Sequence, residues 1–369
     1  MKTAVRIITT ILLALAAIFF YEAKLSAADF GTEELYDVLP KESREYLDSK
    51  NITPENNGFS GITISDIMND IAGIITDNLE KPGKMLVSLI GVILLTSLFS
   101  ALRGDSTNRS YDKTLSLVSS LCVTIIVSVY LSDCLTLISS VLSSSSNFML
   151  TYIPILAGVM AAEGQTASAT VFSSVMIISI ELMSQVVTGF LLPFLSTVLG
   201  ISAAGGINPD LKLEKLTDGI KKVVIWLLGL IMTIFIGVLS LQSSISVSTD
   251  SIALKAVRFA VSSSVPFVGG AVSDALATVK TSVQLIKSGI GSFGIIAGAS
   301  ILLPVLINTL IYKLFLFIGK TIGDIFGNEN VTNMIKSGEN VMSIILAIIS
   351  CFFVFVTVST ALVLIICRG

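Results

Sequence analysis

Long apolar runs alternate with short polar connections along most of the chain. A helix needs about 20 apolar residues to cross a bilayer. Six runs approach or exceed that length, and the second of them extends toward residue 142. They lie at residues 85–102, 114–132, 167–199, 223–241, 288–312 and 340–367. This pattern predicts an all-α fold, a polytopic membrane helical bundle with about six spans that fills residues 85–369.

Two further apolar stretches do not fit ordinary spans, because proline and glycine interrupt them. One is 148–162, which contains Pro154, and the other is 252–287, which contains Pro266. Both fit Pro-broken helices that are re-entrant or lie in the membrane interface. If 148–162 crossed the bilayer fully, the orientation of everything after it would be reversed.

The N-terminus has the order of features found in secretory signal peptides. Lys2 and Arg6 precede an apolar run at 7–21, and small residues follow as far as Ala28. We therefore predict a signal peptide over residues 1–28, with an uncleaved first anchor as the alternative. Either reading predicts that the segment after it is translocated.

Residues 29–84 form the only long polar stretch, and we assign them to a short extracytoplasmic segment. Apolar residues between Ile64 and Leu79 recur at three- and four-residue spacing, which predicts an amphipathic helix from Ser65 to Glu80. Pro82 and Gly83 are expected to stop it. The helix would lie on the membrane surface or pack on a partner.

The basic residues orient the spans. Lys and Arg cluster in three connections, 103–113, 205–222 and 313–339, whereas 139–167 has neither. The positive-inside rule places the three basic connections in the cytoplasm, although 246–289 carries four cations on the opposite side.

Composition narrows the chemistry. Only 13% of the residues are charged, the net charge is -3, and the chain has no His. The charge does not favour nucleic acid, and the missing His removes the usual general bases and metal ligands. The four Cys form no CxxC pair, and no phosphate-binding glycine motif follows a predicted strand. We therefore predict a protein that is not an enzyme and needs no cofactor or metal.

The proline spacing indicates an internal duplication. Pro154 and Pro193 are 39 residues apart, Pro266 and Pro304 are 38 apart, and the two pairs are offset by 112 and 111 residues. The predicted repeats are 114–204 and 223–320. Duplicated units with broken segments are typical of transporters and channels. The prolines would kink their helices, either for function or only for packing.

Four residues stand out inside the predicted spans. Glu181 is an acid in mid-span with Gln185 one turn later, which marks either a proton or substrate site or a paired structural acid. Gly294 and Gly298 form a small-xxx-small pair that lets helices approach closely. The pair fits packing within the chain and homo-oligomerisation equally well.

Several short elements follow one another in order in the second half of the chain. They read TIFIGVLSLQ at 233–242, KAVRF at 255–259, VPFVGG at 265–270 and IYKL at 311–314. Together with the signal segment, the short polar segment and the Ile-Pro-Ile at 153–155, this order resembles the stage III sporulation protein AE family.

The resemblance implies a role in endospore formation. It implies an integral membrane protein in the mother-cell membrane that surrounds the forespore. Its partners would be the other stage III A operon proteins and a forespore-side membrane protein, which together form a channel or secretion-like apparatus. It implies no catalytic residues. The leading hypothesis is thus a permease-like subunit of that complex; the alternatives are a stand-alone secondary transporter of a small solute and a purely structural anchor.

Overall fold

The structure is a computed structural model that describes residues 31–54, 63–102, 109–205, 213–264 and 269–366. Every regular element in these residues is a helix. Those of the polar segment are α2 (Glu33–Val38), α3 (Lys41–Ser49) and α4 (Ile64–Asp77). Those of the bundle are α5 (Glu80–Leu102), α6 (Arg109–Ala162), α7 (Thr166–Ser184), the π-helix η3 (Gln185–Leu191), α8 (Leu192–Gly205), α9 (Leu213–Ser264), α10 (Gly269–Ile325) and α11 (Glu329–Ile366).

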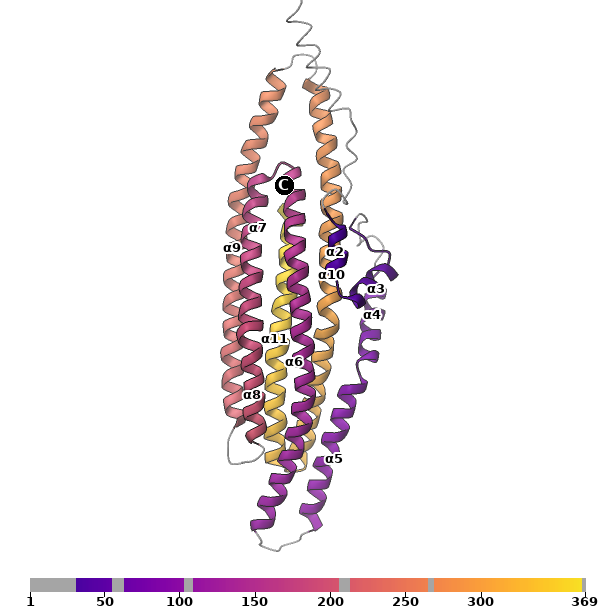
Figure 1. Cartoon of the computed structure of the whole chain (residues 1–369), viewed down its shortest axis with the longest axis vertical. Coiled ribbons are helices and arrows are strands. Elements are labelled where there is room, and N and C mark those ends of the chain that lie inside the picture. The colour runs from indigo at the N-terminus through magenta and orange to yellow at the C-terminus, as the bar shows by residue number, and fades with distance from the viewer. Residues whose placement is uncertain (1–30, 55–62, 103–108, 206–212, 265–268, 367–369) are drawn as a thin grey trace, which may run out of the picture.

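The prediction of an all-α bundle with six spans is confirmed. Six helical stretches are long and apolar enough to cross a membrane: Glu80–Leu102, Thr114–Ala162, Thr166–Gly200, Lys215–Ser240, Ser288–Ile325 and Glu329–Thr360. They run up and down along one long axis, with α11 and α6 in the middle of the view (Figure 1). The helices α5, α8 and α10 therefore end, and α6, α9 and α11 begin, toward the same end of the bundle. The three basic connections of the sequence link these helix ends.

The stretch 148–162 differs from the prediction, because it is not a separate segment. It continues the second span in one helix of 54 residues, α6, whose length of about 80 Å greatly exceeds the ~30 Å of a bilayer core. Pro154 lies inside this helix. A proline removes a single N–H donor, and helices packed in an apolar bundle tolerate that loss.

The stretch 252–287 is also helical wherever it is described. Its first part completes α9 and its second part begins α10, while Pro266 lies outside the described residues. The upper parts of α9 and α10 rise beyond the turn that joins α6 to α7 (Figure 1). Each predicted repeat thus contains an ascending and a descending helix, and the duplication itself stays a prediction.

The N-terminal segment departs from the prediction at one point. The amphipathic helix ends at Asp77, and Pro82 and Gly83 belong to the first turns of α5. Proline fits there because the first N–H groups of a helix have no acceptor within the helix. The Thr63 N–H donates to the Asp66 carboxylate at 3.0 Å, which caps α4. The predicted signal peptide lies outside the described residues.

Glycines set the tightest helix contacts in the core. A Cβ on Gly294 would lie 2.3 Å from the Tyr152 ring, and one on Gly298 would lie 2.5 Å from Val356 Cγ1. Tyr152 is fully buried and its hydroxyl donates to the Ile290 carbonyl at 3.3 Å. Both glycines of the small-xxx-small pair therefore face other helices of the same chain.

Candidate functional site

A group of hydrogen-bonded polar side chains joins the helices near the turn between α10 and α11. The Asn328 amide donates to Ser97 Oγ at 2.9 Å, and the Asn330 amide donates to Ser116 Oγ at 2.5 Å. The hydroxyls of Thr96 and Ser119 share a hydrogen bond of 2.7 Å. These contacts tie α5 and α6 to the start of α11 through uncharged groups.

A second polar group lies between α9, α10 and α11. Lys221 Nζ donates to Asn340 Oδ1 at 3.2 Å, and the Asn340 amide donates to Thr217 Oγ1 at 3.3 Å. Lys320 Nζ and Glu339 Oε2 form an ion pair at 3.3 Å, with only 22% and 17% of their side chains exposed. Partly buried charges of this kind are stabilised by direct pairing.

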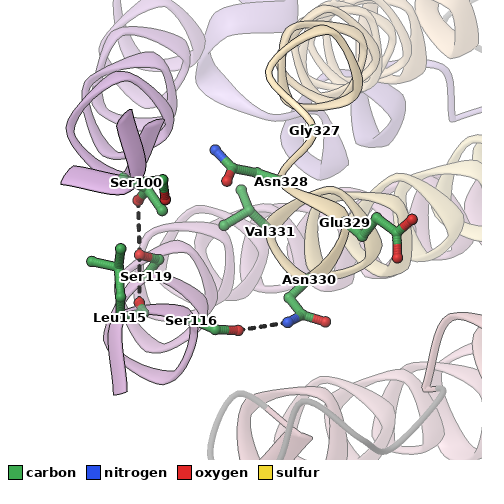
Figure 2. Close-up of a pocket in the computed structure, with 10 residues that line it drawn as sticks. Ser100, Leu115, Ser116, Ser119, Gly327, Asn328, Glu329, Asn330 and Val331 are labelled. Carbon is green, nitrogen blue, oxygen red and sulfur yellow. Dashed lines mark hydrogen bonds between the residues drawn. The ribbon is translucent and has the colours of Figure 1, made fainter. Parts of the chain in front are cut away.

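The first group encloses a pocket of about 250 Å³. Figure 2 shows Ser116 and Ser119 on one side and Asn328 and Asn330 on the other, with the Glu329 carboxylate directed away from the serines. The pocket is lined by Thr96, Ser100, Leu115, Ser116, Ser119, Gly327, Asn328, Glu329, Asn330 and Val331. Its neutral donors and acceptors suit water or an uncharged polar group.

Hydroxyl side chains recur at every fourth residue of α6, starting at this pocket. We call this row the hydroxyl ridge. It consists of Ser116, Ser120, Thr124, Ser128, Ser132, Thr136, Ser140 and Ser144. Residues four apart form a continuous ridge on a helix. Each step also turns the row by about 40°, so the ridge winds from the core at Ser120 to the outside at Ser132.

The buried part of the ridge carries polar atoms without partners. Ser120 is 0% exposed and Thr124 is 6% exposed. Neither hydroxyl has a hydrogen-bond partner among the described residues. A buried hydroxyl of this kind is destabilising unless something pairs with it.

A second pocket, of about 350 Å³, follows directly along the ridge. It is lined by Ser128, Ser132, Leu135, Thr136, Ser196, Leu199 and Gly200, from α6 and α8. Ser120 and Thr124 lie on the ridge between the residues that line the two pockets. The ridge from Ser116 to Thr136 is about 30 Å long, close to the thickness of a bilayer core.

The residues singled out from the sequence do not meet at this ridge. Glu181 and Gln185 lie on the exposed outer face of α7 and η3. Pro304 lies inside α10, and Pro193 is the second residue of α8, directly after the π-helix. The roles of these residues stay predictions.

The hydroxyl ridge was missed at the level of the sequence, although its signal is present there. The serine-rich stretch 139–146 by itself is typical of a turn or of helix packing. The regular four-residue spacing, which begins at Ser116, becomes meaningful only once 109–162 is one helix. A search for polar rows at helical spacing would have found it.

Comparisons with known proteins identify the family. The family model for stage III sporulation protein AE matches residues 48–367. The chain is 26% identical over 277 residues to the stage III sporulation protein AE of Bacillus subtilis (strain 168). The aligned region covers 72% of this chain and 68% of that protein. No solved structure gives a significant match. The chain therefore belongs to the stage III sporulation protein AE family.

Proposed function

We propose that this protein is the permease-like membrane subunit of the complex that connects mother cell and forespore during sporulation. Family membership supports a role in sporulation. The observation that carries the finer proposal is the hydroxyl ridge, which runs along α6 past two pockets and carries two buried hydroxyls without partners among the described residues. In this proposal the ridge is the route by which water or a small uncharged solute moves along α6.

The chemistry of the ridge favours transport over catalysis. Hydroxyls are neutral donors and acceptors, so they replace the hydrogen bonds that a polar solute loses when it leaves water. A nucleophile would need a neighbouring base, and the ridge residues are all serine or threonine. The proposal therefore assigns the protein no catalytic residues, cofactor or metal.

The proposed setting is the mother-cell membrane around the forespore. The polar segment 29–84, after the signal peptide, would be translocated, and the three basic connections would lie in the cytoplasm. The proposed partners are the other stage III A proteins and a forespore-side membrane protein. The projecting α9–α10 hairpin lies at the end opposite the basic connections (Figure 1), which in this orientation is the side of the forespore partner.

Affinity purification from sporulating cells tests this proposal. A tagged full-length chain should bring down the other stage III A proteins from cells in which the forespore is engulfed. The alternative, a stand-alone secondary transporter, predicts that the chain purifies alone and moves a solute in vesicles without partners. A structural anchor predicts loss of partner assembly when the chain is deleted, with no permeation in any condition. Either of these outcomes would overturn the proposal.

A further inference from the structure

The outer face of α7 and η3 exposes the large apolar residues Val171, Leu182 and Phe190, and beside them a row that includes a carboxyl and an amide. Ser174, Ile178, Glu181 and Gln185 are all exposed. They are spaced by four, three and four residues, which is the spacing by which one helix faces another along a seam. We call this row the α7 seam.

The π-helix keeps the seam on the same face. A π-helical turn contains more residues than an α-helical turn. The next exposed positions on this face after Gln185 are Gly189 and then Pro193. A Cβ added to Gly189 would meet no atom of this chain within 4 Å. The seam therefore continues past the polar pair into a stretch where another helix can approach closely.

The outer face of α5 shows what contact with lipid requires. Within residues 85–102 its exposed large side chains are all apolar: Val87, Leu94, Leu95, Leu98, Phe99 and Leu102. The α7 seam instead places a carboxyl and an amide at the surface. A charged or polar group facing acyl chains is strongly disfavoured, by about 2.5–3.5 kcal/mol for a carboxylate at mid-span.

Nothing in the described part of the chain compensates for that exposure. Neither the Glu181 carboxyl nor the Gln185 amide makes a hydrogen bond or ion pair with another described residue. In the middle of a span, another membrane helix at the same depth can supply the missing partners.

We propose that the α7 seam binds a second copy of this chain around a two-fold axis normal to the membrane. Such an axis brings the two seams together at equal depth and in parallel. The Glu181 carboxyl of one copy then forms a hydrogen bond with the Gln185 amide of the other, and the two-fold axis repeats the contact. The pair is self-complementary, so a second copy supplies every partner that the seam needs.

Cysteine cross-linking of the full-length chain in membranes tests this interface. Cys122, Cys134, Cys351 and Cys367 are first replaced by serine. A single cysteine is then introduced by Ile178→Cys in the seam or by Leu95→Cys on α5; the native side chains are 66% and 57% exposed. Under oxidation, Ile178→Cys should give a product of twice the chain mass at a yield about tenfold above that of Leu95→Cys.

Two further variants test whether the cross-linking depends on the Glu181–Gln185 contact or only on packing of the two helices. Glu181→Gln keeps a donor and an acceptor, so cross-linking through position 178 should persist. Glu181→Leu removes both, and cross-linking should fall by about tenfold. The thermal transition of the detergent-solubilised monomer should not fall in either variant, since the side chain is exposed within one copy.

Three results would overturn the interface. The first is no dimer with Ile178→Cys, and the second is equal yields at positions 178 and 95. The third is a cross-linked product of another mass, which would mean that a different protein occupies the seam. The experiment is independent of sporulation or transport, so it does not depend on the proposed function.

Discussion

Two rows of polar residues run along apolar helices of this protein, and they face in opposite directions. The hydroxyl ridge of α6 turns into the bundle at Ser120 and Thr124, whereas the α7 seam turns outward at Glu181 and Gln185. Residues of the ridge line two pockets within the chain. In our proposals the buried part of the ridge serves a small polar solute, whereas the exposed seam binds a second copy of the chain.

Glycines also differ between the buried core and the outer face of the bundle, and replacing a buried one gives the largest expected effect on the free energy of unfolding. Gly294→Ala would place a Cβ 2.3 Å from the buried Tyr152 ring, and we expect a loss of roughly 3 kcal/mol in the free energy of unfolding. Gly237→Ala on the outer face of α9 has no atom within 4 Å of its new Cβ. It should leave stability unchanged or raise it, by up to about 1 kcal/mol.

Thermal unfolding of the two purified variants in detergent checks this pair. If both variants unfold at the temperature of the parent chain, Tyr152 has room to move and the α6–α10 contact is not as tight as the structure shows. Equal destabilisation of both variants would mean that the outer face of α9 packs against another protein surface, as we propose for the α7 seam.

The partly buried ion pair gives an intermediate effect. Glu339→Gln leaves Lys320 without its charged partner between α10 and α11, and we expect a loss of about 1–2 kcal/mol. The matched control is Glu45→Gln, because the Lys41–Glu45 pair of α3 is exposed on both sides. Chemical denaturation should detect the first change and not the second. If Glu45→Gln lowered the free energy of unfolding as much as Glu339→Gln does, burial would not be what makes the Lys320–Glu339 pair stabilising.

The hydroxyl ridge itself can be removed with little change of shape. The double variant Ser120→Ala with Thr124→Val deletes two buried, unpaired hydroxyls. We expect stability to stay within about 1 kcal/mol of the parent, shifted toward greater stability, while the yield of heat-resistant spores falls. Ser139→Ala with Ser143→Ala, off the ridge on α6, is the control. Normal spore yield in the double variant would remove the ridge from the proposed route.

Much of the fold follows from the sequence, because a bilayer span is long and its apolar signal is strong. The six spans were confirmed on this basis, and so was the family. The continuity of α6 did not follow, since Pro154 and the serines of 139–146 are local helix-breaking signals that tertiary packing overrides. The outward direction of Glu181 did not follow either. Helical spacing defines which residues share a face, and only the packing of α7 on α6 and α9 decides which face is covered.

The smallest expected effect comes from a polar contact outside the bundle. Tyr46 donates to Asp70 at 2.9 Å, and Lys50 binds the same carboxylate at 3.1 Å, which docks α3 on α4. Burial first, and then the bond to Asp70, raises the pKa of Tyr46 from 10.0 to about 12. Because the folded state favours the neutral phenol, its contribution is complete below the ordinary value and is lost as the pH rises through about 12. Difference absorbance of the parent chain against Tyr46→Phe should show one tyrosine titrating late. If Tyr46 titrated at its ordinary pKa, its contact with Asp70 would not stabilise the docking of α3 on α4. Polar contacts outside the bundle would then be weaker than those inside it.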